Sequence, residues 1–327
     1  MEVETSRVSY RIRKYWEGFH AVFKHISAKL VSLAASAAAA LALIAAPATL
    51  NVPEAKADVC PAVVVVAARG SGQNSQIYPT WYSAGAPYAS NGWEGETIRA
   101  MLRTVESRYQ ATHGGASVMN SVYVLGLTPQ DYPATYPAYT VPDVGLPQGI
   151  GDVIAILAQY ASPVLNTAIS AANQFNYSMQ TGRKGVMNAI NGYERASGCR
   201  PKYILTGFSQ GAMVLAEHEK ELAARGQLAG AVYMGNPMTR KGDPTTVGNT
   251  ATEGGPLGWT PLNTVTAAGT PNRINYCLPQ DGVCDTSVGT LMASRGNGGN
   301  HGRYFQWWSQ WDNQVADAVG RWIDQAR

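Results

Sequence analysis

Apolar runs and apolar residues at helical spacing alternate along most of the chain. Residues 60–68 form a continuous apolar run around four β-branched valines, typical of a strand buried on both faces of a parallel sheet. Residues 94–110 have apolar side chains three and four positions apart, which predicts a helix. Residues 117–127 predict a second strand, and the alternation continues through strands at 203–205 and 229–234. The pattern predicts an α/β fold with a doubly wound, mainly parallel sheet.

Two loop-rich stretches interrupt this alternation and are predicted to be insertions, at about 128–180 and 238–271. The first begins with a part rich in proline and tyrosine, in which Tyr132 is a candidate for lining an acyl groove. It continues into an apolar helix predicted over 149–175, with a break near Pro163. We interpret this helix as packing over the sheet, and a mobile lid is the alternative.

The C-terminal segment, 304–323, is predicted to be an amphipathic closing helix. Its apolar residues recur three or four positions apart, at 308, 311, 315, 319 and 322. We interpret its aromatic residues as part of the core.

The N-terminus has the layout of a secretory signal peptide. A basic segment precedes the apolar run 30–46, and the triplet Ala55-Lys56-Ala57 predicts cleavage after Ala57. An uncleaved membrane anchor is the alternative, although the run is shorter than the ~20 residues of a typical span. Residues 1–57 are therefore predicted to be a leader, and 58–327 one large domain that is secreted.

The net charge of +3 belongs to the leader. The first 57 residues contain seven of the 25 basic and four of the 22 acidic residues, so the remainder has 18 of each. A neutral exported part offers no electrostatic reason to bind nucleic acid.

The four cysteines all follow the leader, which predicts two disulfides with three possible pairings. Cys277 and Cys284 are seven residues apart and flank a Pro-Gln-Asp-Gly turn, so we predict that they pair locally. Cys60 and Cys199 then form the other bridge. Histidines are too sparse near these cysteines for a zinc site, and no metal is predicted.

The segment 207–211 has the form G-x-S-x-G. It follows the predicted strand at 203–205 and precedes good helix formers, the arrangement of a nucleophile elbow that exposes Ser209. Glycine is required at Gly207 and Gly211 because the turn leaves no room for a Cβ atom.

A serine hydroxyl needs a base within hydrogen-bond reach, and that base needs an orienting acid. In α/β-hydrolases the chain order is serine, acid, histidine. Of the histidines after the leader, His113 precedes the serine, and His218 is predicted to be solvated on the elbow helix. His301, in a glycine-rich loop, is selected as the base by elimination.

The acid is expected between the serine and His301. Asp281 lies inside the predicted Cys277–Cys284 loop, where a crosslink would hold its carboxylate rigidly, and it is also a good turn residue before Gly282. Asp285, just outside the bridge, is the alternative.

Together these motifs resemble the cutinase family of serine esterases. Residues 207–211 are similar to its G-Y-S-Q-G elbow, with Phe208 in place of tyrosine, and 277–284 to its C-x-x-x-D-x-x-C acid loop. Residues 68–71 are similar to its first oxyanion loop, and Cys60 with Cys199 to its long disulfide. The gap from the acid loop to the histidine and the two insertions are longer than in a compact fungal cutinase.

The resemblance implies a secreted, monomeric esterase that acts on lipid or polyester esters, contacts a lipid interface and uses no cofactor. It implies that Ser209 is the nucleophile, His301 the base and Asp281 the orienting acid. It further implies that the backbone N–H groups of Ser71 and Gln210 bind the oxyanion, where one such donor contributes ~2.7–4 kcal/mol to the transition state.

Two alternatives stay open. Residues 235–238, Gly-Asn-Pro-Met, are similar to phage mycolyl-arabinogalactan esterases, so an esterase or acyltransferase of mycolyl or other cell-envelope glycolipids is the second reading. An envelope-binding protein with a silent site is the alternative from another functional class.

Overall fold

A computed structural model describes residues 60–135, 150–259, 270–294 and 299–327, and within 150–169 only the course of the backbone. The chain divides into two compact units, one of residues 53–139 and 166–327 and the other of residues 1–52 and 140–165. Among the described residues, every strand belongs to the first of these.

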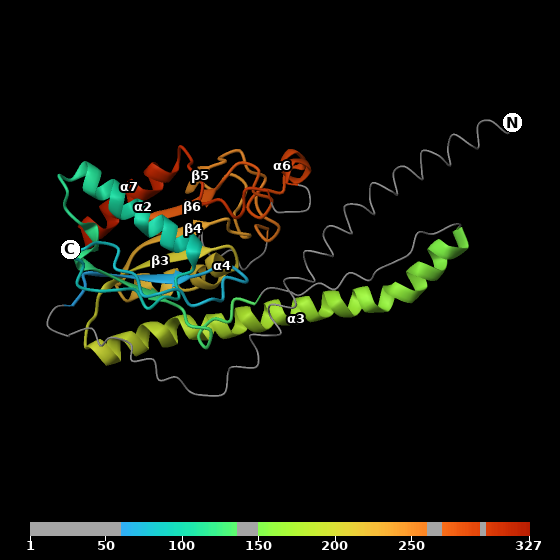
Figure 1. The fold of residues 1–327 in the computed structure, drawn as a ribbon, viewed down its shortest axis with the longest axis horizontal. Coiled ribbons are helices and arrows are strands. Elements are labelled where there is room, and N and C mark those ends of the chain that lie inside the picture. The colour runs from blue at the N-terminus through green and yellow to red at the C-terminus, as the bar shows by residue number, and fades with distance from the viewer. Residues whose placement is uncertain (1–59, 136–149, 260–269, 295–298) are drawn as a thin grey trace. The chain divides into compact units, whose positions relative to one another are not determined.

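The elements of the described chain follow the predicted alternation of strands and helices (Figure 1). In order they are β1 (Val63–Ala68), α2 (Glu96–Thr112), η2 (Val118–Ser121), β2 (Val122–Gly126), α3 (Ile150–Ser197), β3 (Lys202–Phe208), α4 (Gln210–Ala216), α5 (Glu219–Ala224), β4 (Leu228–Met234), β5 (Thr246–Gly248), β6 (Arg273–Cys277), α6 (Val288–Ala293) and α7 (Asp312–Ala326).

The strands form one six-stranded sheet in the order β2-β1-β3-β4-β6-β5, and every neighbouring pair is parallel. This confirms the predicted α/β fold. Because the carboxyl ends of parallel strands lie at one edge, the loops after β1, β3, β4 and β6 meet there.

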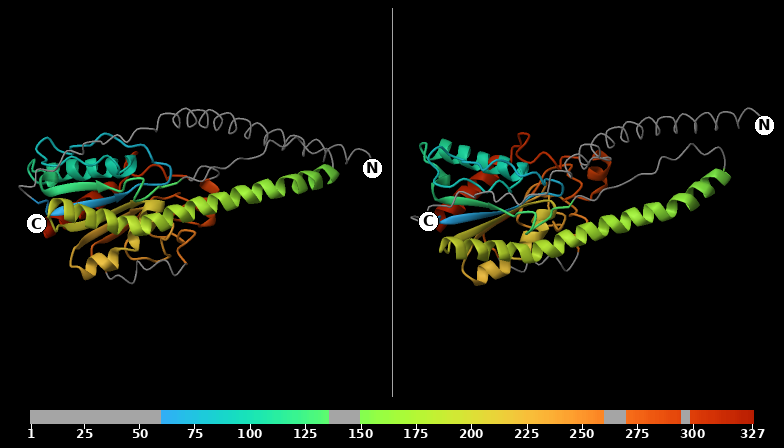
Figure 2. Two further views of the ribbon diagram at one scale, coloured as in Figure 1. Left: turned by 90° about the horizontal axis from the view of Figure 1, so that it is seen from below. Right: turned by 60° about the horizontal axis from the view of Figure 1, so that its bottom comes forward.

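Both faces of the sheet are covered, and strands β1 and β4 are accordingly apolar along their whole length (Figures 1 and 2). Val63 and Val65 of β1 pack in one cluster with residues of α2 and α7. Val64 and Val66 pack in the other, with residues of α4 and of the part of α3 that follows residue 170.

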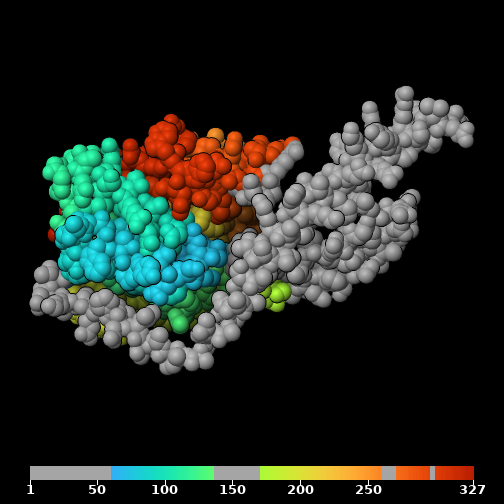
Figure 3. Space-filling view, in the orientation of Figure 1, coloured from blue at the N-terminus to red at the C-terminus, as the bar shows by residue number. Residues whose placement is uncertain are grey.

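Helices α2 and α7 also contact each other on their side of the sheet. Arg108 of α2 pairs with Asp317 of α7 at 2.8 Å, and Tyr109 donates a hydrogen bond to Asp324 at 2.8 Å. Figure 3 shows the resulting surface, where C-terminal residues in red adjoin α2 residues in blue-green.

The predicted strand at 117–127 is shorter in the structure, because a 3-10 turn, η2, precedes β2. The sequence pattern did not predict β5 and β6. Strand β6 contains Arg273 and Asn275, which are buried but polar. Because of these two residues, the pattern of apolar positions does not indicate a strand.

The predicted break near Pro163 and the predicted helix end at 175 are both wrong. Helix α3 continues through Pro163 to Ser197. Proline removes one backbone hydrogen bond, but a long helix can bend around it. Beyond residue 175, Val186 and Ile190 pack under the sheet and extend the amphipathic pattern. Among the described residues, no helix is both long and apolar enough to span a membrane.

The C-terminal helix begins later than predicted, at Asp312. Phe305 has φ 56°, which a right-handed helix excludes, so the helix cannot include it. The residues between Phe305 and Asp312 form turns and bends instead. Trp307 and Trp308, predicted to belong to the core, are 65% and 86% exposed. The stripe from Val315 to Trp322 is buried, as predicted.

The leader, 1–57, lies outside the described residues, as do 136–149 and 260–269 within the two predicted insertions.

Candidate active site

Ser209 occupies the sharp turn between β3 and α4. Its φ of 53° and ψ of −121° lie where a residue with a Cβ atom is strained. Its backbone N–H donates to Met234 O at 2.9 Å, and its carbonyl accepts from Ala212 N at 3.0 Å. The turn is therefore held by the neighbouring strand and by the first turn of the helix.

The two flanking glycines allow this turn to form. A Cβ atom on Gly207 would lie 2.5 Å from Ala212 Cα, and one on Gly211 would lie 2.0 Å from Ala68 O. Both neighbours are backbone atoms that cannot move aside. Close packing of β3 against the start of α4 therefore requires glycine at 207, and close packing of the elbow against β1 requires glycine at 211.

His301 and Asp281 form a hydrogen-bonded pair beside this turn. His301 Nδ1 lies 3.1 Å from Asp281 Oδ1 and 3.0 Å from Oδ2. The Asp281 side chain is fully buried, whereas that of His301 is 20% exposed. The buried carboxylate therefore directs Nε2 of the imidazole away from itself.

The imidazole is placed next to the elbow by two contacts. The Phe208 ring stacks on it with centroids 4.8 Å apart. A Cβ atom on Gly235 would lie 2.6 Å from His301 Cε1, so the glycine that follows β4 leaves room for the ring. The described contacts include no hydrogen bond from Ser209 Oγ to His301, and in free enzymes this bond often tightens only when substrate binds.

The acid loop is fixed at both ends. A disulfide joins Cys277 to Cys284, and Val283 N donates to Asp281 Oδ1 at 2.8 Å. Asp281 also forms an isolated antiparallel bridge with Gly299, which ties the acid loop to the histidine loop. The second disulfide joins Cys60 to Cys199, so β1 is tied to the end of α3.

The two disulfides are expected to have different effects when removed. On the chain-entropy model, the Cys277→Ser/Cys284→Ser variant loses about 2.5 kcal/mol of unfolding free energy and the Cys60→Ser/Cys199→Ser variant about 5 kcal/mol. Only the first should also lower turnover per folded molecule, because only that bridge holds Asp281. Urea unfolding and ester hydrolysis by both variants test this expectation, and equal turnover in the two would contradict it.

Asp285, the alternative acid, points elsewhere. Its carboxylate accepts hydrogen bonds from Thr290 Oγ1 at 2.5 Å, Asn249 Nδ2 at 2.9 Å, Glu253 N at 3.0 Å and both the hydroxyl and the backbone N–H of Ser287. Burial would raise the pKa of Asp285, but the hydrogen bonds outweigh it and lower the pKa. Asp285 therefore holds α6 and the residues around 250 in place.

We expect the Asp285→Asn substitution to destabilise the fold by about 3 kcal/mol at neutral pH, because an amide cannot accept all of these donors. A folded-state pKa below the unfolded one adds stability at pH values above the unfolded pKa, and this stability is lost as pH falls through the folded pKa. The difference between wild type and variant should thus shrink below about pH 4. Unfolding curves from pH 3 to 7 measure it, and a constant difference would contradict the assignment.

Gln210 begins α4 directly after the nucleophile. As the first residue of the helix, its backbone N–H has no partner within α4 and can serve an oxyanion. Its buried side chain is anchored, because Oε1 accepts from Tyr132 Oη at 3.0 Å and from Ser178 Oγ at 2.9 Å. Tyr132 is fully buried and so does not line an acyl groove.

Ser71 lies in the loop after β1, between two neighbours that are fixed by backbone hydrogen bonds. Gly72 N donates to Ala134 O at 2.9 Å, and Gln73 N donates to Gly70 O at 3.1 Å. Within the described part of the chain, no hydrogen bond uses the backbone N–H of Ser71. This donor is thus available for an oxyanion.

Arg69 anchors the same loop from inside the protein, a function that the sequence analysis missed. The fully buried guanidinium donates to Tyr132 O at 2.9 Å, to Asn74 Oδ1 at 2.8 Å and to Leu127 O. Burial lowers its pKa to about 10, so it stays protonated at neutral pH. It therefore fixes the loop that contains Ser71.

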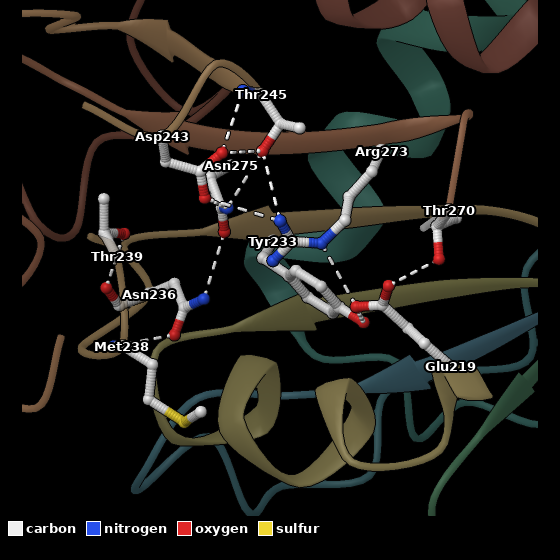
Figure 4. A network of polar contacts seen from close by, with 10 residues as sticks. All are labelled: Glu219, Tyr233, Asn236, Met238, Thr239, Asp243, Thr245, Thr270, Arg273 and Asn275. Atoms are coloured by element: carbon white, nitrogen blue, oxygen red, sulfur yellow. Dashed lines mark hydrogen bonds and ion pairs between the residues drawn. The ribbon is translucent and has the colours of Figure 1, made fainter. Parts of the chain in front are cut away.

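A buried polar network supports the loop after β4 (Figure 4). Arg273 lies between two carboxylates, 3.2 Å from Glu219 and 3.4 Å from Asp243. Asn275 continues the network, donating to Asp243 at 2.9 Å and accepting from Asn236 at 3.0 Å. Asn236 directly follows Gly235, so the network holds the backbone against which His301 lies.

The other two histidines of the described residues, His113 and His218, have different surroundings. His113 ends α2 and stacks on Tyr109 with centroids 3.8 Å apart. His218, predicted to be solvated, is instead only 8% exposed at the start of α5, and burial lowers its pKa. Among the described residues, no group of three or more His, Cys, Asp or Glu side chains could hold a metal ion.

Residues 167–312, which include Ser209, Asp281 and His301, match the family model described as Cutinase. A solved cutinase-like protein from Cryptococcus sp. is 18% identical, with 82% of this chain and 96% of that chain covered and a TM-score of 0.46. An acetyl xylan esterase is 18% identical, with 81% and 100% covered and a TM-score of 0.43. A Trichoderma reesei cutinase in complex with a phosphonate inhibitor is 18% identical, with 90% and 87% covered and a TM-score of 0.33. A comparison with curated proteins finds no match.

Proposed function

We propose that this chain, whose residues 167–312 match the family model described as Cutinase, hydrolyses carboxylic esters through an acyl-enzyme formed on Ser209. Ester hydrolysis is the activity of the family. The observation that supports the particular mechanism is the buried Asp281–His301 pair, with bonds of 3.0 and 3.1 Å, placed beside the strained serine of the elbow.

In the proposed reaction, Ser209 Oγ attacks the ester carbonyl while His301 Nε2 accepts its proton. Asp281 holds Nδ1–H and stabilises the imidazolium that forms. The backbone N–H groups of Ser71 and Gln210 stabilise the negative carbonyl oxygen. The alcohol leaves with the proton from His301. Water then attacks the acyl-enzyme and passes a proton to His301. The bond between the acyl carbon and Ser209 Oγ breaks, the carboxylic acid leaves, and His301 returns the proton to Ser209.

The surroundings of the pair support a lipid or polyester substrate. Helix α6, which follows the acid loop, exposes Val288, Leu291 and Met292 to 78%, 49% and 55%. The exposed Trp307 and Trp308 come shortly after His301. Exposed apolar side chains before and after His301 along the chain favour an ester whose acyl part leaves water on binding.

We also propose that the protein is secreted after loss of residues 1–57. The two disulfides support this proposal, because such bonds persist in oxidising compartments outside the cytosol. The N-terminal sequence of the exported protein tests it, and a start at Asp58 is expected.

The proposed function is tested by hydrolysis of p-nitrophenyl esters from C2 to C16, together with labelling by an organophosphonate. We expect turnover with a defined optimum of chain length and a mass increase on the peptide that contains Ser209. Labelling without turnover would favour an acyltransferase or an envelope glycolipid esterase. A folded protein that shows neither would contradict the proposal and favour a binding protein.

A further inference from the structure

Tyr304 is a buried residue that makes a direct contact with the proposed acid. It lies three residues after His301, and its side chain is fully buried. Its hydroxyl donates to Asp281 Oδ2 at 2.5 Å, the same oxygen that lies 3.0 Å from His301 Nδ1. Asp281 Oδ1 accepts from Val283 N and from His301 Nδ1. Each carboxylate oxygen thus has one fixed donor besides the imidazole, and for Oδ2 that donor is Tyr304.

The direction of this hydrogen bond is determined by the other neighbours of the hydroxyl. Leu278 N donates to Tyr304 Oη at 3.0 Å, so the tyrosine oxygen is the acceptor there. Cys284 Sγ, 3.5 Å away, belongs to a disulfide and has no proton to give. The proton of Tyr304 is therefore left for Asp281. Burial, together with the charge of Asp281, raises the pKa of Tyr304 well above its ordinary value, so the hydroxyl remains a donor.

We propose that Tyr304 is a positioning residue of the active site, which holds the Asp281 carboxylate oriented toward His301 Nδ1. This inference rests on the proposed function, because it assigns to Tyr304 a part in the same reaction. Hydrogen bonds to a charged, buried group are stronger than those between neutral groups, since the surroundings screen them little. Without Tyr304, Oδ2 loses its fixed donor and the anion is less stable.

The other ionisable groups around this contact are few among the described residues. The Tyr304 ring makes edge contacts with Phe208, Tyr276 and His301, with centroids 5.9, 5.1 and 6.5 Å apart. Tyr276 of β6 donates to Asp312 of α7 at 2.7 Å, and burial raises the pKa of Asp312. Asp312 thus bonds to Tyr276 while Tyr304 bonds to Asp281.

This arrangement supplies a matched pair of variants. Tyr304→Phe and Tyr276→Phe each remove one buried hydroxyl that donates to a buried aspartate, from rings that touch each other. Only Tyr304→Phe changes the aspartate that faces His301. We expect Tyr304→Phe to lower kcat roughly 10-fold to 100-fold with little change in KM. Tyr276→Phe should lower stability but keep kcat per folded molecule.

The pH profile separates positioning from general destabilisation. Without the Tyr304 hydrogen bond, the negative charge of Asp281 is no longer shared with a hydroxyl and acts more strongly on the imidazolium of His301. The acidic limb of kcat/KM should therefore move upward in Tyr304→Phe. An unchanged pH profile in Tyr304→Phe, with equal losses of kcat in both variants, would overturn the proposal and make Tyr304 a packing residue.

Two further measurements keep the test decisive. If Tyr304→Phe does not fold, a fluorinated tyrosine at position 304 keeps the ring but donates more strongly, and it should move the acidic limb to lower pH. The low-field NMR signal of His301 Nδ1–H reads the Asp281 contact without turnover. We expect it to shift in Tyr304→Phe and to stay in place in Tyr276→Phe. Absence of both turnover and organophosphonate labelling in wild type would refute the proposed function, whereas the NMR result would still show whether Tyr304 positions Asp281.

Discussion

Replacing Ser209 with alanine is expected to lower ester turnover by roughly 10⁶-fold, because no other group can form the acyl-enzyme. The fold should persist, since Ala212 N and Met234 O are bonded to backbone atoms of residue 209 and not to its hydroxyl. Turnover of p-nitrophenyl esters and circular dichroism of the same sample measure both effects. Residual turnover within 100-fold of wild type would contradict the assignment of the nucleophile.

A second substitution at this position separates strain from chemistry. Ser209→Gly should be as inactive as Ser209→Ala but more stable by about 1 kcal/mol, because glycine adopts the φ of 53° without strain. Chemical unfolding of the two variants measures the difference. A glycine variant less stable than the alanine variant would show that the turn is not strained.

The Asp281→Asn substitution is expected to lower kcat by roughly 10⁴-fold while KM stays nearly constant. An amide in place of the carboxylate cannot stabilise an imidazolium, and its N–H₂ group would compete with the donors on Oδ1 and Oδ2. The loss of kcat should be greatest at the pH values at which turnover requires His301 to change from imidazole to imidazolium. Steady-state kinetics from pH 5 to 9 measure it.

Asp285→Asn provides the matched control for this prediction. Both aspartates are buried and both lie near the same disulfide, but only Asp281 contacts His301. Asp285→Asn should therefore lose stability and keep kcat per folded molecule. A comparable loss of kcat in the two variants would imply that the acid loop acts as one structural unit and that Asp281 has no special part.

Much of the candidate site could be predicted because its signals are local. The elbow at 207–211 depends on a glycine two residues before and two residues after Ser209. A Cβ atom at either glycine would clash with backbone atoms. The acid loop likewise depends on two cysteines and an aspartate within eight residues. Such short spacings leave the chain few conformations, so the residue types alone predict the local structure of the elbow and of the acid loop.

The contacts missed from the sequence join residues that are distant along the chain. Arg69 reaches the carbonyls of Leu127 and Tyr132, and Tyr132 in turn reaches the side chain of Gln210. No spacing rule connects these positions. Tyr304 contacts Asp281 although the two residues are 23 positions apart in the sequence. The sequence indicates this contact only through the position of Tyr304 three residues after His301.

The chain by itself determined the alternation of strands and helices as far as β4, the strained serine turn and a crosslinked acid loop, because each depends on neighbours within a few residues. Only the tertiary structure decided which aspartate faces the imidazole. Asp281 and Asp285 have similar sequence surroundings, but one meets His301 and Tyr304 while the other is surrounded by donors from α6 and the loop near residue 250. The function of a buried carboxylate depends on the donors that reach it, and these come together only when β6 and the loops beyond it pack against the sheet.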